Sequence, residues 1–393
     1  MRSVSRPAAS EYSKFWSLDP AVTFLNHGSF GACPIAVLER QRSLRQQLER
    51  QPLRFMVKEL EPLLDQSRIA LADFVGADAD DLVFVPNATT GINTVLRSLS
   101  FQPEDELLTT NQEYNASRNA LNFVAERSGA AVAVADIPFP IASPDQVVEA
   151  VLAKVSSQTK LVLLDHVVSQ TSLVLPISTL AQQLSIRGIE LLVDGAHAPG
   201  MIPLNLAELG ATYYTGNCHK WLCAPKGSAF LYVKRDRQPT IRPLTISHGA
   251  NSTRTDRSRF HQEFDWTGTG DPTAYLCIAK ALRFMGSILP GGWTELMAQN
   301  RDMAIAAQKI LCQALEIEPP CPIEMIGSMA TVPLPNGDWE PLYNALGDRF
   351  NIEVPIIPWH PSGQRLIRIS AQIYNHLAEY KYLAAALLIS LKE

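Results

Sequence analysis

Short apolar runs alternate with longer amphipathic segments through the middle of the chain. The runs LVFV (82–85), ELLTT (106–110), KLVLLD (160–165) and IELLVD (189–194) are mostly apolar without the every-second-residue alternation of a half-exposed strand. Strands of this kind are buried on both faces, as is typical of parallel sheets. Between the runs lie helical patterns, such as the apolar spacing in residues 92–99. The pattern predicts an α/β fold with a mainly parallel central sheet sandwiched by helices.

The pattern changes in the last third of the chain. A polar, arginine-rich stretch at 234–272 has few helical signals, and a Pro/Gly turn follows near 286–292. Beyond it, strands and helices occur in mixed order. The length of 393 residues favours two domains. We predict an N-terminal arm and active-site loop (1–33), a large ligand-binding domain (34–285) and a smaller α+β C-terminal domain (286–393).

Residues 191–233 contain two strand ends that carry reactive groups. The run LLVD ends in Asp194, and the run YYTGN leads into a polar turn with His219 and Lys220. Parallel neighbours would bring the acid and the lysine together at the carboxyl edge of the sheet, where open α/β folds bind ligands. A carboxylate for a ring nitrogen and an amine for a Schiff base are what pyridoxal 5'-phosphate (PLP) requires. Lys226 is a rival amine, but its Pro-Lys-Gly turn favours exposure to solvent.

A phosphate group would need a helix N-terminus, and residues 87–91 offer one. The turn NATTG follows the strand pattern LVFV and opens a helix, so free N–H groups and the hydroxyls of Thr89 and Thr90 lie at the strand end. Ordinary N-capping by threonine is the alternative role of these hydroxyls.

Other side chains at strand ends could supply the remaining contacts of the cofactor. Tyr114 offers a flat ring for stacking, and His166 and His197 offer hydrogen bonds to a phenolic oxygen. A single histidine at a strand end often has only a structural hydrogen bond. The clustering of several such side chains at one sheet edge is what favours a cofactor site.

Two segments near the N-terminus leave alternatives open. The loop TFLNHGSFGACP (23–34) is either a plain helix start or a loop whose glycines let Asn26 and His27 approach a ligand. Arg54, between a proline and apolar residues, is either solvated or directed toward a substrate.

Composition narrows the classes of partner. The net charge of −5 gives no indication of nucleic acid or of an anionic membrane. No apolar stretch approaches the roughly 18 residues of a membrane span, and the first residues contain no long apolar run. The six cysteines form no C-x-x-C pair, so we expect free thiols, no metal site and a cytoplasmic protein. The glycine signatures of dinucleotide and P-loop binding are missing, which disfavours nucleotide binding. The PLP-type residues indicate a small-molecule, amino-acid-like substrate instead.

Longer motifs resemble a known family. VDGAHAPG followed by TGNCHKWLCAPKG is similar to the class V aminotransferase family of fold-type I PLP enzymes, and the resemblance runs over nearly the whole chain. LNHGSFGACP, VPNATTGIN, DHVVSQT, GNCHKWL, FDWTGTGDP and RLIRISAQIYN resemble its isopenicillin N epimerase-like branch. The resemblance implies PLP as cofactor and chemistry at the α-carbon of an amino acid or a peptide-like amine.

The resemblance also implies roles for single residues. Lys220 would form the Schiff base and act as base, Asp194 would pair with the pyridine nitrogen, and Tyr114 would take the ring-stacking position. His197 and His166 match positions near the phenolic oxygen. The phosphate would be held by Thr89, Thr90, Asn217 and His219.

Two further matches extend the site. Thr269 corresponds to a threonine that reaches the phosphate of the neighbouring subunit, which implies a homodimer. Arg368 corresponds to the arginine that grips the α-carboxylate of the substrate, a task that suits a planar guanidinium.

One departure from the family pattern bears on the reaction. Cysteine desulfurases carry a nucleophilic cysteine on a loop shortly before this arginine, whereas PIIPWHPSGQRLIRIS contains none and Cys321 lies well upstream. We therefore expect no persulfide-forming desulfurase. Loss of the α-proton could lead to epimerisation, transamination or elimination, and the branch favours an epimerase. A cysteine/cystine-type C–S lyase without a catalytic cysteine and a non-catalytic PLP-binding sensor are the alternatives.

Overall fold

The structure is a computed structural model that describes residues 7, 8, 10–359 and 363–392. A seven-stranded sheet has the strand order β2-β8-β7-β6-β5-β3-β4. The neighbours from β7 to β4 pair in parallel, and only β8 runs antiparallel to its two neighbours. The predicted mainly parallel α/β fold is therefore confirmed. The strands are β2 (Leu82–Val85), β3 (Glu106–Thr110), β4 (Ala131–Ala135), β5 (Thr159–Asp165), β6 (Glu190–Asp194), β7 (Tyr213–Asn217) and β8 (Ala229–Val233).

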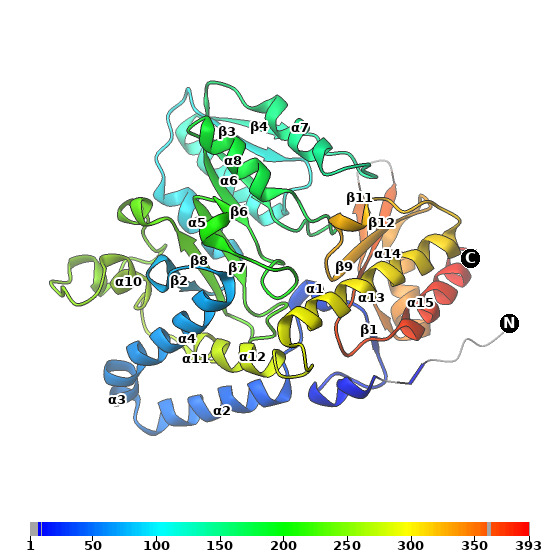
Figure 1. Cartoon of the computed structure of the whole chain (residues 1–393), viewed down its shortest axis with the longest axis horizontal. Coiled ribbons are helices and arrows are strands. Elements are labelled where there is room, and N and C mark those ends of the chain that lie inside the picture. Colours follow the sequence, from blue (N-terminus) through cyan, green and yellow to red (C-terminus); the bar gives the residue numbers. More distant parts are fainter. Residues whose placement is uncertain (1–6, 9, 360–362, 393) are drawn as a thin grey trace.

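Helices cover both faces of this sheet (Figure 1). Alternate residues of one strand enter different cores: Leu82 and Phe84 belong to one apolar cluster, and Val83 and Val85 to another. This two-sided burial is what the continuous apolar runs predict. The helices of this part are α2 (Ile35–Arg50), α3 (Pro52–Arg54), α4 (Leu60–Val75), α5 (Ala88–Ser98), α6 (Asn115–Ser128), α7 (Asp145–Lys154), α8 (Ile177–Ile186), α9 (Leu206–Leu209), α10 (Arg259–Phe264), α11 (Thr273–Leu276) and α12 (Ile278–Met285).

The polar stretch after β8 contains more local helix than its sequence suggested. Besides α10, it forms the 3-10 turns η4 and η5. The helical segment that follows this stretch is interrupted at Cys277, between α11 and α12. The short non-α helices are η1 (Glu11–Phe15), η2 (Phe55–Glu59, a π-helix), η3 (Ala79–Asp81), η4 (Arg235–Thr240), η5 (His248–Asn251) and η6 (Ile323–Met325).

A smaller antiparallel sheet with the order β11-β12-β9 forms the C-terminal part, beside the large sheet in Figure 1. Its elements are α13 (Gly292–Leu315), β9 (Met329–Leu334), α14 (Trp339–Phe350), β11 (Ile356–Trp359), β12 (Gln364–Ser370) and α15 (Leu377–Ser390). The predicted boundary near 286–292 falls between α12 and α13, and the division into domains stays a prediction.

The N-terminal segment is built into this second part. Strand β1 (Thr23–Phe24) pairs in parallel with β10 (Ile352–Glu353), and the short helix α1 (His27–Phe30) follows directly. This long-range pairing places the loop 23–34 between the two sheets (Figure 1). Among the described residues, no helix is long and apolar enough to cross a membrane.

Candidate active site

Asp194 and Lys220 meet in a pocket at the carboxyl edge of the large sheet. Asp194 ends β6, and its oxygens accept hydrogen bonds from the Ala196 N–H at 3.0 Å and from the Ser117 hydroxyl at 2.8 Å. Lys220 follows β7, and its Nζ lies 3.0 Å from Nε2 of His197. Burial lowers the pKa of Lys220 to about 7. Neutral amine is therefore available at neutral pH, as a nucleophilic lysine requires.

The N-terminus of α5 opens into the same pocket. Asn87 caps the helix by accepting from the Thr90 N–H at 2.8 Å, and Asn217 accepts from the Ala88 N–H at 2.9 Å. Asparagines rather than threonines therefore satisfy these two N–H groups. Thr89, which lines the pocket, lies between them at the positive end of the helix dipole. An anion is favoured at this position.

His219 adds a second polar group near this helix end. Its Nδ1 donates to the Ser228 carbonyl at 2.9 Å, and burial lowers its pKa to about 4. The imidazole is therefore neutral, with Nε2 as the acceptor nitrogen. A phosphate dianion nearby would favour the protonated ring, which could then donate to it.

His197 has an unused hydrogen-bonding atom. Its pKa lies well below the usual value because of burial, so the ring is neutral. Because Nε2 faces the Lys220 amine, Nδ1 can carry the proton, and Nδ1 has no hydrogen-bond partner among the described residues.

His166 is placed differently. Its Nδ1 lies 2.9 Å from the Tyr214 hydroxyl, and Asp165 and Ser169 rather than His166 line the pocket. Its predicted contact with a phenolic oxygen stays a prediction.

Arg368, on β12, presents a buried cation that has no acidic partner within the part of the chain that the structure describes. It is 4% exposed, and burial lowers its pKa only to about 10, so it stays charged at neutral pH. Its guanidinium donates to the Ser169 carbonyl at 2.6 Å and to the Ser29 hydroxyl at 2.7 Å, with Asn26 Oδ1 at 3.4 Å. These partners are neutral, and its Nε has none among the described residues. A buried, uncompensated charge of this kind favours binding of an anion.

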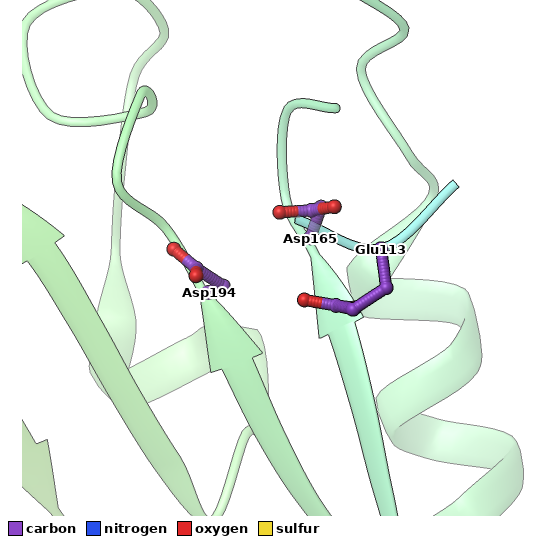
Figure 2. Close-up of side chains that lie close together, drawn as sticks. All are labelled: Glu113, Asp165 and Asp194. Carbon is purple, nitrogen blue, oxygen red and sulfur yellow. The ribbon is translucent and has the colours of Figure 1, made fainter. Parts of the chain in front are cut away.

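Two further carboxylates lie beside Asp194 (Figure 2). Asp165 stands opposite Asp194 in the register of β5 and β6, and Glu113 reaches toward both from the turn before α6. One oxygen from each of the three lies within 4.8 Å of the others. Tyr114, at the N-terminus of α6, donates its N–H to Asp165 at 3.2 Å, and the residue is 44% exposed. Burial raises the pKa of all three carboxyls, that of Glu113 to about 8.

We expect Glu113→Gln to reduce the dependence of stability on pH. The pKa of Glu113 rises from an ordinary 4.5 to about 8 because of burial and the charge of Asp194. A raised pKa in the folded state stabilises the fold fully below pH 4.5, and this stabilisation is lost as pH rises through about 8. Thermal unfolding of the cofactor-free protein between pH 5 and 9 should show a smaller fall in Tm for Glu113→Gln. The exposed Glu104→Gln is the control, and equal slopes for all three proteins would contradict the expectation.

The other predicted site residues lie outside this pocket. Thr90, the next residue around α5, lines a neighbouring cavity formed with Trp266 and Gly268 instead. Thr269 is exposed on the loop 267–271. Arg54 is 67% exposed and pairs with Glu59 at 2.7 Å, in agreement with a solvated arginine.

Some pocket residues were not singled out from the sequence. Asp165 and Ser169 lie at the same strand end as His166, and this position could have marked them as candidates. Which of these side chains faces the pocket depends on the path of the chain after β5. Ser29 and Ser117 carry no signal of their own, because a serine near a helix start is usually a cap.

These residues match the three polar ends of PLP. The α5 N-terminus suits a phosphate, Asp194 suits a protonated ring nitrogen, and Lys220 suits an aldehyde. His197, whose Nε2 faces the Lys220 amine, suits the phenolic oxygen, and Tyr114 remains accessible for stacking.

Comparisons with known proteins agree with this site. The sequence model of the family described as Aminotransferase class-V matches residues 34–383. Isopenicillin N epimerase of Amycolatopsis lactamdurans is 37% identical over 388 residues, covering 94% of this chain and 96% of the relative. A probable chloroplastic L-cysteine desulfhydrase of Arabidopsis thaliana is 30% identical, with 95% and 84% covered. The solved cystine C-S lyase C-DES shares the fold at a TM-score of 0.78 and 23% identity, with 93% and 97% covered.

Proposed function

Since this chain belongs to the class V aminotransferase family, we propose that it is a PLP-dependent enzyme acting at the α-carbon of an amino acid or a peptide-like amine. The observation that carries the proposal is the convergence of three groups. The Lys220 amine and the Asp194 carboxylate lie in one pocket, and Ser29 and Ser169 of its wall hold the guanidinium of Arg368.

PLP, when bound, supplies the electron sink for bonds broken at the α-carbon. In the proposed reaction Arg368 binds the α-carboxylate of the substrate through two parallel hydrogen bonds. Lys220 first holds the cofactor and then, once displaced by the substrate amine, takes the α-proton at Nζ. Asp194, fixed by Ser117, keeps the ring nitrogen protonated.

We propose epimerisation as the first candidate reaction, because relatives named isopenicillin N epimerase are 37% and 32% identical to this chain. A C–S lyase is the second candidate, supported by relatives named L-cysteine desulfhydrase. A thiol-dependent desulfurase is disfavoured. All six cysteines are buried, and burial raises the pKa of every one of these thiols.

An amino-acid panel in deuterated water tests the proposal. The PLP-loaded protein is incubated with L-amino acids and a δ-linked aminoadipyl peptide, and products are read by mass spectrometry and chiral chromatography. Deuterium at Cα with inverted configuration indicates an epimerase, a keto acid a transaminase, and pyruvate with sulfide a lyase. Cofactor binding without exchange in any substrate would instead fit the non-catalytic sensor and would exclude the proposed function.

We also propose a homodimer in which Thr269 of the partner subunit reaches the phosphate end of the pocket. Thr269 is exposed, which leaves it accessible to a partner subunit, and several apolar side chains are also exposed and would gain from burial in an interface: Leu53, Val57, Leu244 and Ile246. Sedimentation velocity should give a dimer, and Thr269→Val should weaken PLP binding without changing the assembly. A cytoplasmic location agrees with the six free thiols.

A further inference from the structure

His27 contacts the backbone of Lys220 and does not line the pocket. It is 1% exposed, and its ring centre is 4.8 Å from that of Trp221. Its Nε2 lies 3.1 Å from the backbone carbonyl oxygen of Lys220, and its Nδ1 lies 2.7 Å from the hydroxyl of Tyr374. One imidazole thus bridges the lysine turn and the segment that follows β12.

The partners of His27 determine its tautomer. The Lys220 carbonyl can only accept, so Nε2 carries the proton. The Ala32 N–H points toward Nδ1 at 3.4 Å, so Nδ1 is the bare nitrogen and accepts from the Tyr374 hydroxyl. Gln372 Nε2 approaches Nε2 at a longer 3.5 Å and does not alter this assignment. Burial lowers the pKa of His27 to about 3, which keeps the ring neutral.

The segment around His27, at the start of α1, also contacts the arginine proposed to bind the substrate. Asn26 and Ser29, on either side of His27, contact the guanidinium of Arg368. Gly31 closes the segment against the lysine turn: a side chain there would meet the His219 carbonyl oxygen at 2.2 Å, and its φ of +69° favours glycine. Because backbone packs on backbone here, a displacement of this segment would move Lys220 as well.

We propose that His27 is a positioning residue: the hydrogen bond from its Nε2–H to the Lys220 carbonyl keeps the lysine at a fixed position relative to Arg368. The inference rests on the proposed PLP chemistry. It assigns His27 a role different from substrate contact, because both ring nitrogens are already engaged. Loss of this bond would let the lysine turn relax away from the buried environment that keeps its amine neutral.

Two matched variants test the role of the bond. The amide nitrogen of His27→Gln reaches the position of Nε2 and can still donate to the Lys220 carbonyl. The shorter His27→Asn reaches only the position of Nδ1. Both variants lose the ring packing on Trp221, so packing loss is common to them. Tyr374→Phe removes the second bond alone.

The rate of PLP capture by full-length protein, freed of cofactor with hydroxylamine, is followed by absorbance from pH 6 to 10. The wild-type profile should have its midpoint near pH 7, the pKa of Lys220. His27→Asn should move the midpoint upward and slow capture at pH 7 roughly five- to tenfold. His27→Gln should stay close to wild type. Equal midpoints and capture rates for His27→Asn and His27→Gln would show that His27 acts only through packing and would overturn the proposal.

A second measurement is independent of the cofactor. Nitrogen NMR of histidine-labelled, cofactor-free protein should show Nε2 of His27 protonated and Nδ1 bare from pH 5 to 9, with the signals assigned by their loss in His27→Gln. A protonated Nδ1, or exchange between tautomers, would overturn the proposal. Wild-type protein that captures no PLP would instead reject the proposed function, and the NMR result would still decide the hydrogen bond.

Discussion

Lys220→Ala should lower turnover at the α-carbon by at least about 10³-fold, because it removes both the covalent anchor of the cofactor and the base. The Nζ of this lysine lies 3.0 Å from His197, in the pocket that also contains Asp194. The variant should also lack the visible absorbance band of lysine-bound PLP. After borohydride reduction of the wild type, mass spectrometry should locate the PLP adduct on the peptide that contains Lys220.

Lys226 is the matched control for this experiment. Its side chain is exposed, and its Nζ donates to the Gly31 carbonyl at 2.7 Å instead of facing the pocket. Lys226→Ala should therefore keep the absorbance band and the adduct on Lys220. An adduct on Lys226, or a band that persists in Lys220→Ala with full turnover, would exclude Lys220 as the Schiff-base lysine.

Arg368→Ala should lower kcat/KM by roughly 10²- to nearly 10⁴-fold, since an unpaired carboxylate in a buried site costs about 3–5 kcal/mol. Arg368 is 4% exposed, and its guanidinium contacts only neutral groups among the described residues, so its charge favours the carboxylate of a substrate. Arg368→Lys keeps the charge but loses the planar fork, so it should retain part of the activity. The effect should appear in steady-state kinetics with any substrate found in the panel.

Two controls separate carboxylate binding from a structural effect. Arg365→Ala alters an arginine of the same strand whose guanidinium donates to the Pro335 carbonyl at 2.9 Å, and it should leave kcat/KM within a few-fold of wild type. The decarboxylated amine of the same substrate should react equally slowly with wild type and with Arg368→Ala. If Arg368→Ala slowed that amine as strongly as the amino acid, the arginine would not be the carboxylate-binding group.

The sheet and the convergence of Asp194 and Lys220 at one sheet edge could be predicted because both depend on local sequence. Continuous apolar runs reflect burial on both faces, and residues that end neighbouring parallel strands must lie at one edge. Thr89 and Thr90 were harder to separate. Both occupy the first turn of α5, and the helical rotation of about 100° per residue directs only Thr89 into the active-site pocket.

Other parts of the site depend on contacts between distant segments. The pairing of β1 with β10 joins residues more than 300 positions apart, and two-residue strands leave almost no pattern. The side chains after β5 follow an irregular turn, so the sequence could not rank Asp165, His166 and Ser169 as pocket residues. Glu113 is an ordinary glutamate in the sequence, and only burial beside Asp194 makes its pKa unusual.

The sequence by itself determined the fold class, the family and the lysine and acid around which the site is built, because strand periodicity and local motifs encode them. Only the tertiary structure decided that His27 contacts the Lys220 carbonyl and that Asn87 and Asn217 rather than threonines satisfy N–H groups at the start of α5. It also decided that Arg368 is buried without a counterion among the described residues. The physical reason is that hydrogen-bond partners and desolvation are set by which segments meet in space, and sequence spacing does not encode those meetings.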